Sequence, residues 1–270
     1  MKITYNISEV RPYINWLYFF HSWGLTGKPE EEKAKLKADA ERKLDTWEGR
    51  YHTHAAFEIL DANSDGDDLI LGGVRIPMLR QQFPSVEGHA NLCLADFVRP
   101  LSSGITDKAG AFATSTDPSM EKLDKDDVYE HMMSEILAER LAEGTAELVH
   151  LQVRKTYWGY APDEDLSLDD LLAERYQGIR PAVGYPSLPD ASVNFIISDL
   201  IGMKEIGIRL TENGMMRPKA SVSGLMFAHP KSFYFDLGKI GEDQLKDYAQ
   251  RRGLPIELIR RFLGNRLLGR

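Results

Sequence analysis

Cysteine is almost absent from this chain of 270 residues, because Cys93 is its only one. A single cysteine can form no internal disulfide and no cysteine-rich metal site, and such usage is typical of a reducing compartment. We therefore expect Cys93 to be a small, buried hydrophobic side chain.

The sequence also lacks long apolar runs and an excess of positive charge. No apolar segment follows basic residues at the N-terminus, and nowhere do about eighteen apolar residues follow one another. The formal net charge is -8, whereas sequence-independent binding to nucleic acid relies on Lys and Arg to neutralise phosphates. These absences predict a cytoplasmic protein without a membrane span, whose partner is a small molecule or another protein.

Glycine motifs that cradle nucleotides are missing too, since the chain has neither G-x-G-x-x-G after a strand nor G-x-x-x-x-G-K-[ST]. What is present is the composition of a globular protein, with 43% hydrophobic and 27% charged residues. No linker rich in Pro, Gly and Ser divides the chain, which predicts one domain over residues 1–270.

Apolar patterning predicts a mixed or antiparallel sheet together with several helices. Strands are expected at residues 2–5, 57–60, 69–74, 91–100, 110–116, 207–214, 220–230 and 233–240. Helices are expected at residues 28–47, 119–157, 168–176 and 193–201, with two short ones in 242–265 separated by Gly253.

Residues 178–190, GIRPAVGYPSLPD, can form neither a helix nor a regular strand. Three prolines fix φ and remove backbone donors, while Gly178 and Gly184 permit turns that other residues avoid. This stiff loop carries Arg180 and Tyr185, a pair that suits an anionic group and a π-face. The alternative is a surface connection with an incidental arginine.

Two further polar features have competing interpretations. Asn15 lies between apolar residues, where it caps a helix or turn or else contacts a ligand. Glu139, Glu143 and Glu147 recur four apart along the helix expected at 119–157, which favours a solvated acidic edge.

Two apparent metal motifs are incomplete. His52 and His54 would share one face of a strand, but no third ligand is near them in the sequence. Residues 61–66, DANSDG, match the first half of a calcium loop, but Gly72 stands where a bidentate glutamate is needed. An acidic turn between two strands is the better interpretation.

Eleven short sequence blocks occur in the same order as in a known protein family. They are PYINWLYFF, the GDD turn at 66–68, LRQQ, CLADFVRP, GAFA, ILAERLAE, VRKTYWGYAP, YQGIRPAVGYPSLPD, LTENGMM, ASVSGLMFAHP and DYAQRRG. Together they resemble the reactivation domain of cobalamin-dependent methionine synthase, also called its activation domain, from about residue 12 to the end. Residues 28–54 match poorly, and PSLP stands where the family often has PACP.

The resemblance implies an α+β fold, a single domain with a twisted, mainly antiparallel sheet flanked by helices. It also implies binding of S-adenosylmethionine between that sheet and the arginine loop. The family repairs cobalamin that has been oxidised to Co(II), using one electron from a flavodoxin-type donor and the methyl group of S-adenosylmethionine. Cobalamin itself would be carried by a partner protein.

The same resemblance assigns roles to individual residues. Arg180 would grip the carboxylate of S-adenosylmethionine, and Glu143 and Glu174 would face its positive charges. The expected binding residues are Asn15, Glu143, Glu174, Arg180, Ala182, Tyr185, Tyr234 and Phe235. The family has a second tyrosine where Phe235 stands, so that hydroxyl is lost while the ring remains. The family commonly has an aspartate where Asn15 stands, and the loss of that charge predicts weakened but not abolished binding, by roughly 1 kcal/mol or about fivefold.

The chain contains no D-x-H-x-x-G motif and no block that resembles homocysteine, folate or cobalamin modules. We therefore expect a free-standing reactivation protein, a methyltransferase component that acts in trans on a cobalamin-binding methyltransferase, and not a complete methionine synthase. One alternative is a corrinoid-protein docking module that has lost or weakened S-adenosylmethionine binding. Another is a reactivator of a different corrinoid methyltransferase.

Overall fold

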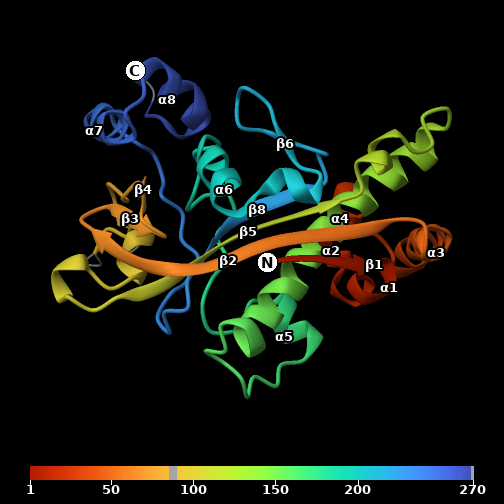
Figure 1. Cartoon of the computed structure of the whole chain (residues 1–270). Coiled ribbons are helices and arrows are strands. Elements are labelled where there is room, and N and C mark those ends of the chain that lie inside the picture. The colour runs from red at the N-terminus through yellow and green to blue at the C-terminus, as the bar shows by residue number, and fades with distance from the viewer. Residues whose placement is uncertain (85–89, 269–270) are drawn as a thin grey trace.

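A long, curled antiparallel sheet crosses the middle of the molecule in the computed structural model, which describes residues 1–84 and 90–268 (Figure 1). Its six strands follow the order β4-β3-β2-β5-β8, and β1 pairs with β2 beside this path. The strands are β1 (Lys2–Asn6), β2 (His52–Asp65), β3 (Asp68–Leu71), β4 (Val74–Pro77), β5 (Asp107–Thr116) and β8 (Ser221–Met226). A separate two-stranded sheet joins β6 (Arg209–Leu210) to β7 (Met216–Arg217).

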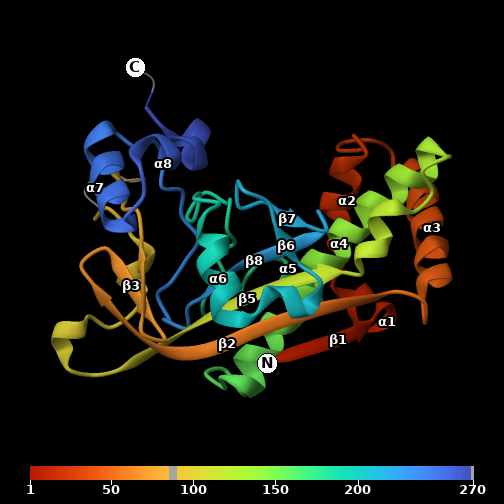
Figure 2. The same ribbon diagram turned by 45° about the horizontal axis from the view of Figure 1, so that its top comes forward.

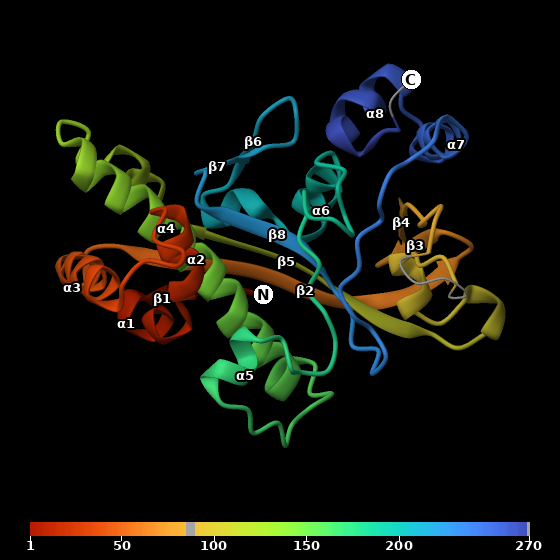
Figure 3. The same ribbon diagram turned by 180° about the vertical axis from the view of Figure 1, so that it is seen from behind.

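Helices cover both faces of this sheet (Figures 2 and 3). One face packs against α1 (Ile7–Val10), α2 (Trp16–Ser22), α3 (Glu30–Trp47) and α4 (Val128–Gln152), and the other packs against α6 (Val193–Ile201), α7 (Glu242–Arg252) and α8 (Ile256–Leu263). Shorter helices are α5 (Leu168–Leu172), the π-helix η5 (Val153–Tyr157), and the 3-10 helices η1 (Arg11–Tyr13), η2 (Leu94–Phe97), η3 (Leu101–Ser103), η4 (Pro118–Lys122), η6 (Met203–Ile206) and η7 (Gly264–Arg266).

Alternation along the strands produces the two hydrophobic cores. Ala55 and Phe57 of β2 face the core beneath α4, whereas Ala56 between them faces the core beneath α6. The fold is therefore α+β with a curled antiparallel sheet flanked by helices, as predicted. Within residues 1–84 and 90–268, no helix combines the length and apolar character needed to cross a bilayer.

Most predicted elements are confirmed, and several bounds change. The helix expected at 193–201 is α6, and the acidic turn lies between β2 and β3, where Gly66 has a φ of 59°. The helix expected at 119–157 begins only at Val128 and ends in a π-turn. The helix expected at 168–176 ends at Leu172, so the prediction is wrong for its last four residues, and Glu174 lies outside the helix.

Two predicted strands are wrong. Residues 91–100 contain the 3-10 helix η2 instead, because the Asp96 carboxylate accepts from the backbone N–H of Cys93 at 2.9 Å and caps that turn. Residues 233–240 form no strand, although Leu237 N–H donates to the Pro186 carbonyl at 3.2 Å. This segment is extended, and its aromatic rings pack against η2. Its last residue, Ile240, forms an isolated bridge with Leu267 in place of a strand ladder.

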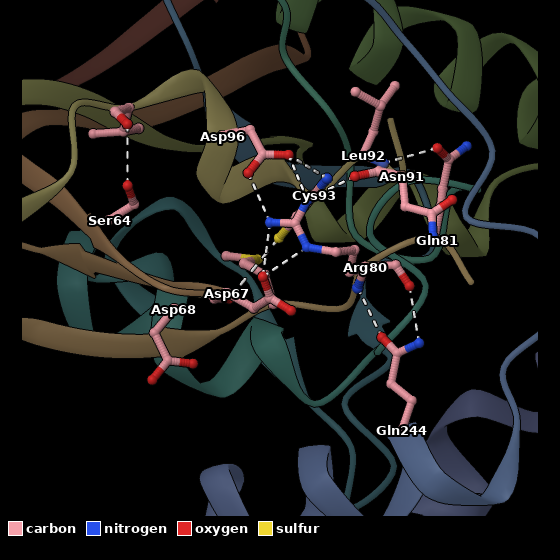
Figure 4. A network of polar contacts seen from close by, with 12 residues as sticks. Ser64, Asp67, Asp68, Arg80, Gln81, Asn91, Leu92, Cys93, Asp96 and Gln244 are labelled. Atoms are coloured by element: carbon pink, nitrogen blue, oxygen red, sulfur yellow. Dashed lines mark hydrogen bonds and ion pairs between the residues drawn. The ribbon is translucent and has the colours of Figure 1, made fainter. Parts of the chain in front are cut away.

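Arg80 of the LRQQ block organises the end of the sheet near α7 (Figure 4). Its guanidinium donates to Asp96 at 2.7 and 2.8 Å and to Asp67 at 2.8 Å. Gln244 of α7 bonds both backbone polar groups of Arg80, at 2.7 and 2.9 Å. These contacts fix η2 and α7 to the β2–β3 turn.

Candidate functional site

The predicted loop at residues 178–190 lies between α5 and α6 and runs beside β8 (Figure 3). Gly178 and Gly184 adopt φ values of 87° and 91°, a region that favours glycine. Ile179 and Phe227 exchange both backbone hydrogen bonds at 2.9 Å, and Val183 N–H donates to the Ser223 carbonyl at 2.8 Å. The loop is therefore attached to the edge of the sheet through its backbone.

Gly224 of β8 makes this close approach possible. A Cβ atom at this position would lie 2.9 Å from Cα of Ala182, and closer still to the carbonyl oxygen of Pro181. Only a residue without a side chain allows the loop to lie so near the strand.

A cavity of about 710 Å³ opens between this loop, α4 and α2. Its volume falls in the range of small-molecule sites, which runs from about 300 to 1,000 Å³. The residues predicted from the resemblance all line it: Asn15, Glu143, Glu174, Arg180, Ala182, Tyr185, Tyr234 and Phe235. The structure thus brings together side chains from four distant parts of the sequence.

Arg180 lines the cavity together with a second arginine, Arg140, and 14% of the Arg180 side chain is exposed. Its Nη2 group donates to Glu147, and its backbone N–H donates to the Tyr234 hydroxyl at 3.0 Å. Burial alone would lower the pKa of Arg180, but Tyr176 and Glu147 hold it well above its ordinary value. Its Nε–H is buried and has no partner among the described residues.

Glu147 is a cavity residue that sequence reasoning missed. The expected solvated acidic edge is wrong at this position, because Glu147 is only 4% exposed. Glu143, one helical turn earlier, accepts from the Tyr185 hydroxyl at 2.9 Å, and burial together with Glu143 raises the pKa of Tyr185. The spacing of four residues between Glu143 and Glu147 was the available signal, since it places both on one face of a helix.

Asn15 combines both roles considered for it. Its Oδ1 accepts from the backbone N–H groups of Leu17 at 3.1 Å and Tyr18 at 3.4 Å, which makes it the N-cap of α2, and it also lines the cavity. The preceding segment lies close to α4 because Gly144 has no side chain, where a Cβ would be 3.2 Å from the Tyr13 carbonyl oxygen.

Glu174 adopts a φ of 57°, a left-handed conformation that is uncommon for residues other than glycine. The side chain keeps contact with solvent, yet burial in the cavity wall raises the pKa of its carboxyl above the ordinary value, with Arg180 opposing that change. The strained backbone turns the chain from α5 toward the loop and leaves this carboxyl at the cavity.

Phe235, which the resemblance assigns to ligand binding, exposes little of its ring to the cavity. It is 8% exposed, and its ring meets those of Phe97 and Phe233 at 6.2 and 6.4 Å in edge-on geometry. Tyr234 is the more polar neighbour, because its hydroxyl accepts from Arg180 N–H and lies 3.5 Å from that of Tyr176.

A buried ion pair between Arg154 and Glu164 packs against Tyr176, next to the cavity. Arg154 is fully buried on the π-turn η5 and donates to Glu164 at 2.7 and 2.8 Å, while its guanidinium carbon lies 4.0 Å from the centroid of the Tyr176 ring. His150 meets the same ring edge-on at 4.9 Å. Burial, with Arg154 and Arg180 nearby, lowers the pKa of His150 well below its ordinary value, so the imidazole is neutral.

The two incomplete metal motifs lie far from this arrangement in the sequence and are held by other contacts. His54 of β2 bonds Asp117 at 2.8 Å and Thr4 at 3.0 Å. Asn63 donates to the carbonyls of Arg99 and Ile105 at 3.1 and 2.9 Å. In the part of the chain that the structure describes, no group of three or more His, Cys, Asp and Glu residues could hold a metal ion. Cys93 is buried, as predicted.

Fold and site together define an α+β domain with a cavity of small-molecule size between a helix and an arginine loop on a sheet edge. Residues 6–253 match the family described as vitamin B12 dependent methionine synthase, activation domain. The chain is also similar to a crystal structure of the MetH reactivation domain bound to AdoHcy, with 38% sequence identity and a TM-score of 0.94. That match covers 100% of this chain and 90% of the other. The chain therefore belongs to the family of vitamin B12-dependent methionine synthase activation domains.

Proposed function

We propose that this chain binds S-adenosylmethionine in the cavity between α4 and residues 178–190, and that it supports reductive remethylation of cob(II)alamin on a cobalamin-dependent methionine synthase. The observation that carries the proposal is Arg180, which lines a cavity of suitable size and whose buried Nε–H has no partner within residues 1–84 and 90–268. A guanidinium with an unpaired N–H donor at a cavity wall suits the carboxylate of an amino acid, because its planar donors match the two carboxylate oxygens. The AdoHcy-bound relative supports the same ligand class.

The chain's own residues would bind and orient this ligand. Arg180 would hold the carboxylate, while Glu143 and Glu174 place negative charge near the ammonium and sulfonium groups. Tyr185 and Tyr234 offer ring surface beside the adenosine. Bound S-adenosylmethionine supplies a methyl group, which together with one electron converts cob(II)alamin to methylcobalamin and leaves S-adenosylhomocysteine.

Catalysis in this proposal consists of positioning. Methyl transfer to cobalt needs an aligned approach and exclusion of water more than an acid or a base. A cavity of arginine, tyrosines and carboxylates fits that requirement. We further propose that the cobalamin is carried by a partner methyltransferase and that a flavodoxin-type protein donates the electron, both on the basis of the family match.

Titration calorimetry with S-adenosylmethionine and S-adenosylhomocysteine tests the binding. We expect one site per chain for each ligand and a large loss of affinity in Arg180→Ala. Absence of binding at millimolar ligand, or an unchanged affinity in Arg180→Ala, would contradict the proposal and favour a docking module without this ligand. Conversion of cob(II)alamin, followed by absorbance with candidate corrinoid proteins and a reductant, then identifies the partner.

A further inference from the structure

Glu147 and Arg180 form an ion pair at the inner wall of the cavity. Side-chain exposure is 6% for Glu147 and 14% for Arg180, so both charges are largely removed from water. A charge buried in this way is costly unless it is paired. Each side chain therefore stabilises the buried charge of the other.

The pair is geometrically incomplete. Nη2 of Arg180 donates to Oε2 of Glu147, whereas Nε of Arg180 and Oε1 of Glu147 are both buried without partners among the described residues. A guanidinium presents five N–H donors in a planar fork, and a complete pair with a carboxylate uses two of them. Here Glu147 contacts one corner of the fork and leaves donors for a second carboxylate.

The other carboxylates of the cavity are arranged differently. Glu143 is engaged by the Tyr185 hydroxyl at 2.9 Å, and Glu174 lies on the strained turn that follows α5. Glu147 is the cavity carboxylate that contacts Arg180 directly. It offsets the charge of the arginine before a ligand arrives, and a site that offers a guanidinium beside several carboxylates suits an end group that carries both a carboxylate and an ammonium better than a lone anion.

Building on the proposed function, we propose that Glu147 is the positioning residue for Arg180. It holds one corner of the guanidinium so that the remaining N–H edge receives the carboxylate of the ligand's α-amino acid end. Glu147 thereby makes the cavity selective for nucleosides that carry an amino acid over the same nucleosides without one.

A comparison of two ligands isolates this role. S-Adenosylhomocysteine carries the amino-acid end, whereas 5′-methylthioadenosine keeps the adenosine and thioether without it. We expect Glu147→Gln to weaken binding of S-adenosylhomocysteine roughly tenfold and that of 5′-methylthioadenosine by less than about twofold, because only the first uses Arg180. Glu139→Gln is the matched control: Glu139 lies on the same helix, pairs with Lys219 at 3.0 Å and is not part of the cavity. It should change neither affinity.

A second variant keeps the charge and shortens the side chain. In Glu147→Asp the carboxylate no longer reaches the guanidinium, so we expect the same selective loss of S-adenosylhomocysteine binding. Equal losses for both ligands would indicate a general structural role and overturn the proposal. Unchanged affinity for S-adenosylhomocysteine in both variants would also overturn it.

The ligand-free protein offers an independent measurement. With Glu147 in place, the hydrogen bond to its carboxylate should hinder rotation of the Arg180 guanidinium, so we expect separate Nη–H signals in a 1H–15N NMR spectrum of the arginine side chains. In Glu147→Gln these signals should merge, and persistence of separate signals would show that Glu147 does not fix the arginine. If the unaltered chain binds neither nucleoside, the proposed function fails, and the NMR result still decides the positioning role.

Discussion

Gly224→Ala is expected to push residues 178–190 away from β8 and to weaken ligand binding. The new methyl carbon would lie 2.9 Å from both Cα of Ala182 and a ring carbon of Phe112. Carbon atoms are most favourably placed about 3.5–4.0 Å apart, so these two contacts alone require a retreat of roughly 0.6–1.1 Å, and the still closer approach to the Pro181 carbonyl oxygen requires more. Overpacking of this kind costs about 1–3 kcal/mol of folding free energy.

The same displacement should reduce affinity. The retreat strains the backbone hydrogen bonds from Val183 to Ser223 and from Leu225 to Pro181, which measure 2.8 and 3.1 Å. Each is worth about 0.5–1.5 kcal/mol. If the binding-competent position of the loop loses about 1–3 kcal/mol of stabilisation, the Kd for S-adenosylhomocysteine should rise roughly 5- to 150-fold.

Urea unfolding and titration calorimetry on the same preparations measure both effects. Gly66→Ala is the control, because Gly66 has a φ of 59° and open space around it in the β2–β3 turn. Its left-handed backbone should also cost roughly 1–2 kcal/mol, but its Kd should stay unchanged. A Gly224→Ala protein that loses stability and binds as tightly as the unaltered chain would refute the inference that attachment to β8 positions the loop.

Three other substitutions test separate parts of the site. Asn15→Asp should preserve the cap on α2, because aspartate is an equally good N-cap, and should tighten binding of S-adenosylmethionine about fivefold by supplying a charge for the ammonium; weaker binding in calorimetry would contradict this. Arg154→Met should lower the free energy of unfolding, measured in urea, by about 3–5 kcal/mol, because it leaves the buried Glu164 carboxylate (6% exposed) unpaired. The double substitution Arg154→Met with Glu164→Met should recover most of that loss. Burial raises the pKa of Glu174 in the folded chain, so its contribution to the free energy of unfolding is complete below the unfolded pKa and is lost as pH rises through the folded pKa. In Glu174→Gln the free energy of unfolding should therefore depend less on pH over this range. An unaltered pH dependence would exclude Glu174 as its source.

Local patterning predicts the elements whose apolar period is regular. Residues 193–201 and the long helix that ends near Gln152 follow such a period, and the structure contains both. Residues 91–100 and 233–240 have strand-like composition but no ladder. In the first, Asp96 and Arg80 form long-range contacts that a local pattern does not contain.

The site could be predicted where a sequence motif marks a residue. Arg180 and Tyr185 stand out because prolines and glycines shape the loop around them, and the resemblance adds the residues from distant segments. Glu147 could not be distinguished from its neighbours, because its burial depends on how the loop at 178–190 meets α4. The same is true of Arg154, whose burial follows from the π-turn at the end of α4 and from Glu164.

A crystal structure of the chain with S-adenosylhomocysteine would show directly whether the cavity is the ligand site. We expect the ligand between α4 and residues 178–190, with its carboxylate within hydrogen-bonding distance of the Arg180 guanidinium and its adenosine beside Tyr185 or Tyr234. A ligand bound elsewhere, for example in the more open cavity between α3 and α5 that Lys37 and Leu168 line, would contradict this expectation.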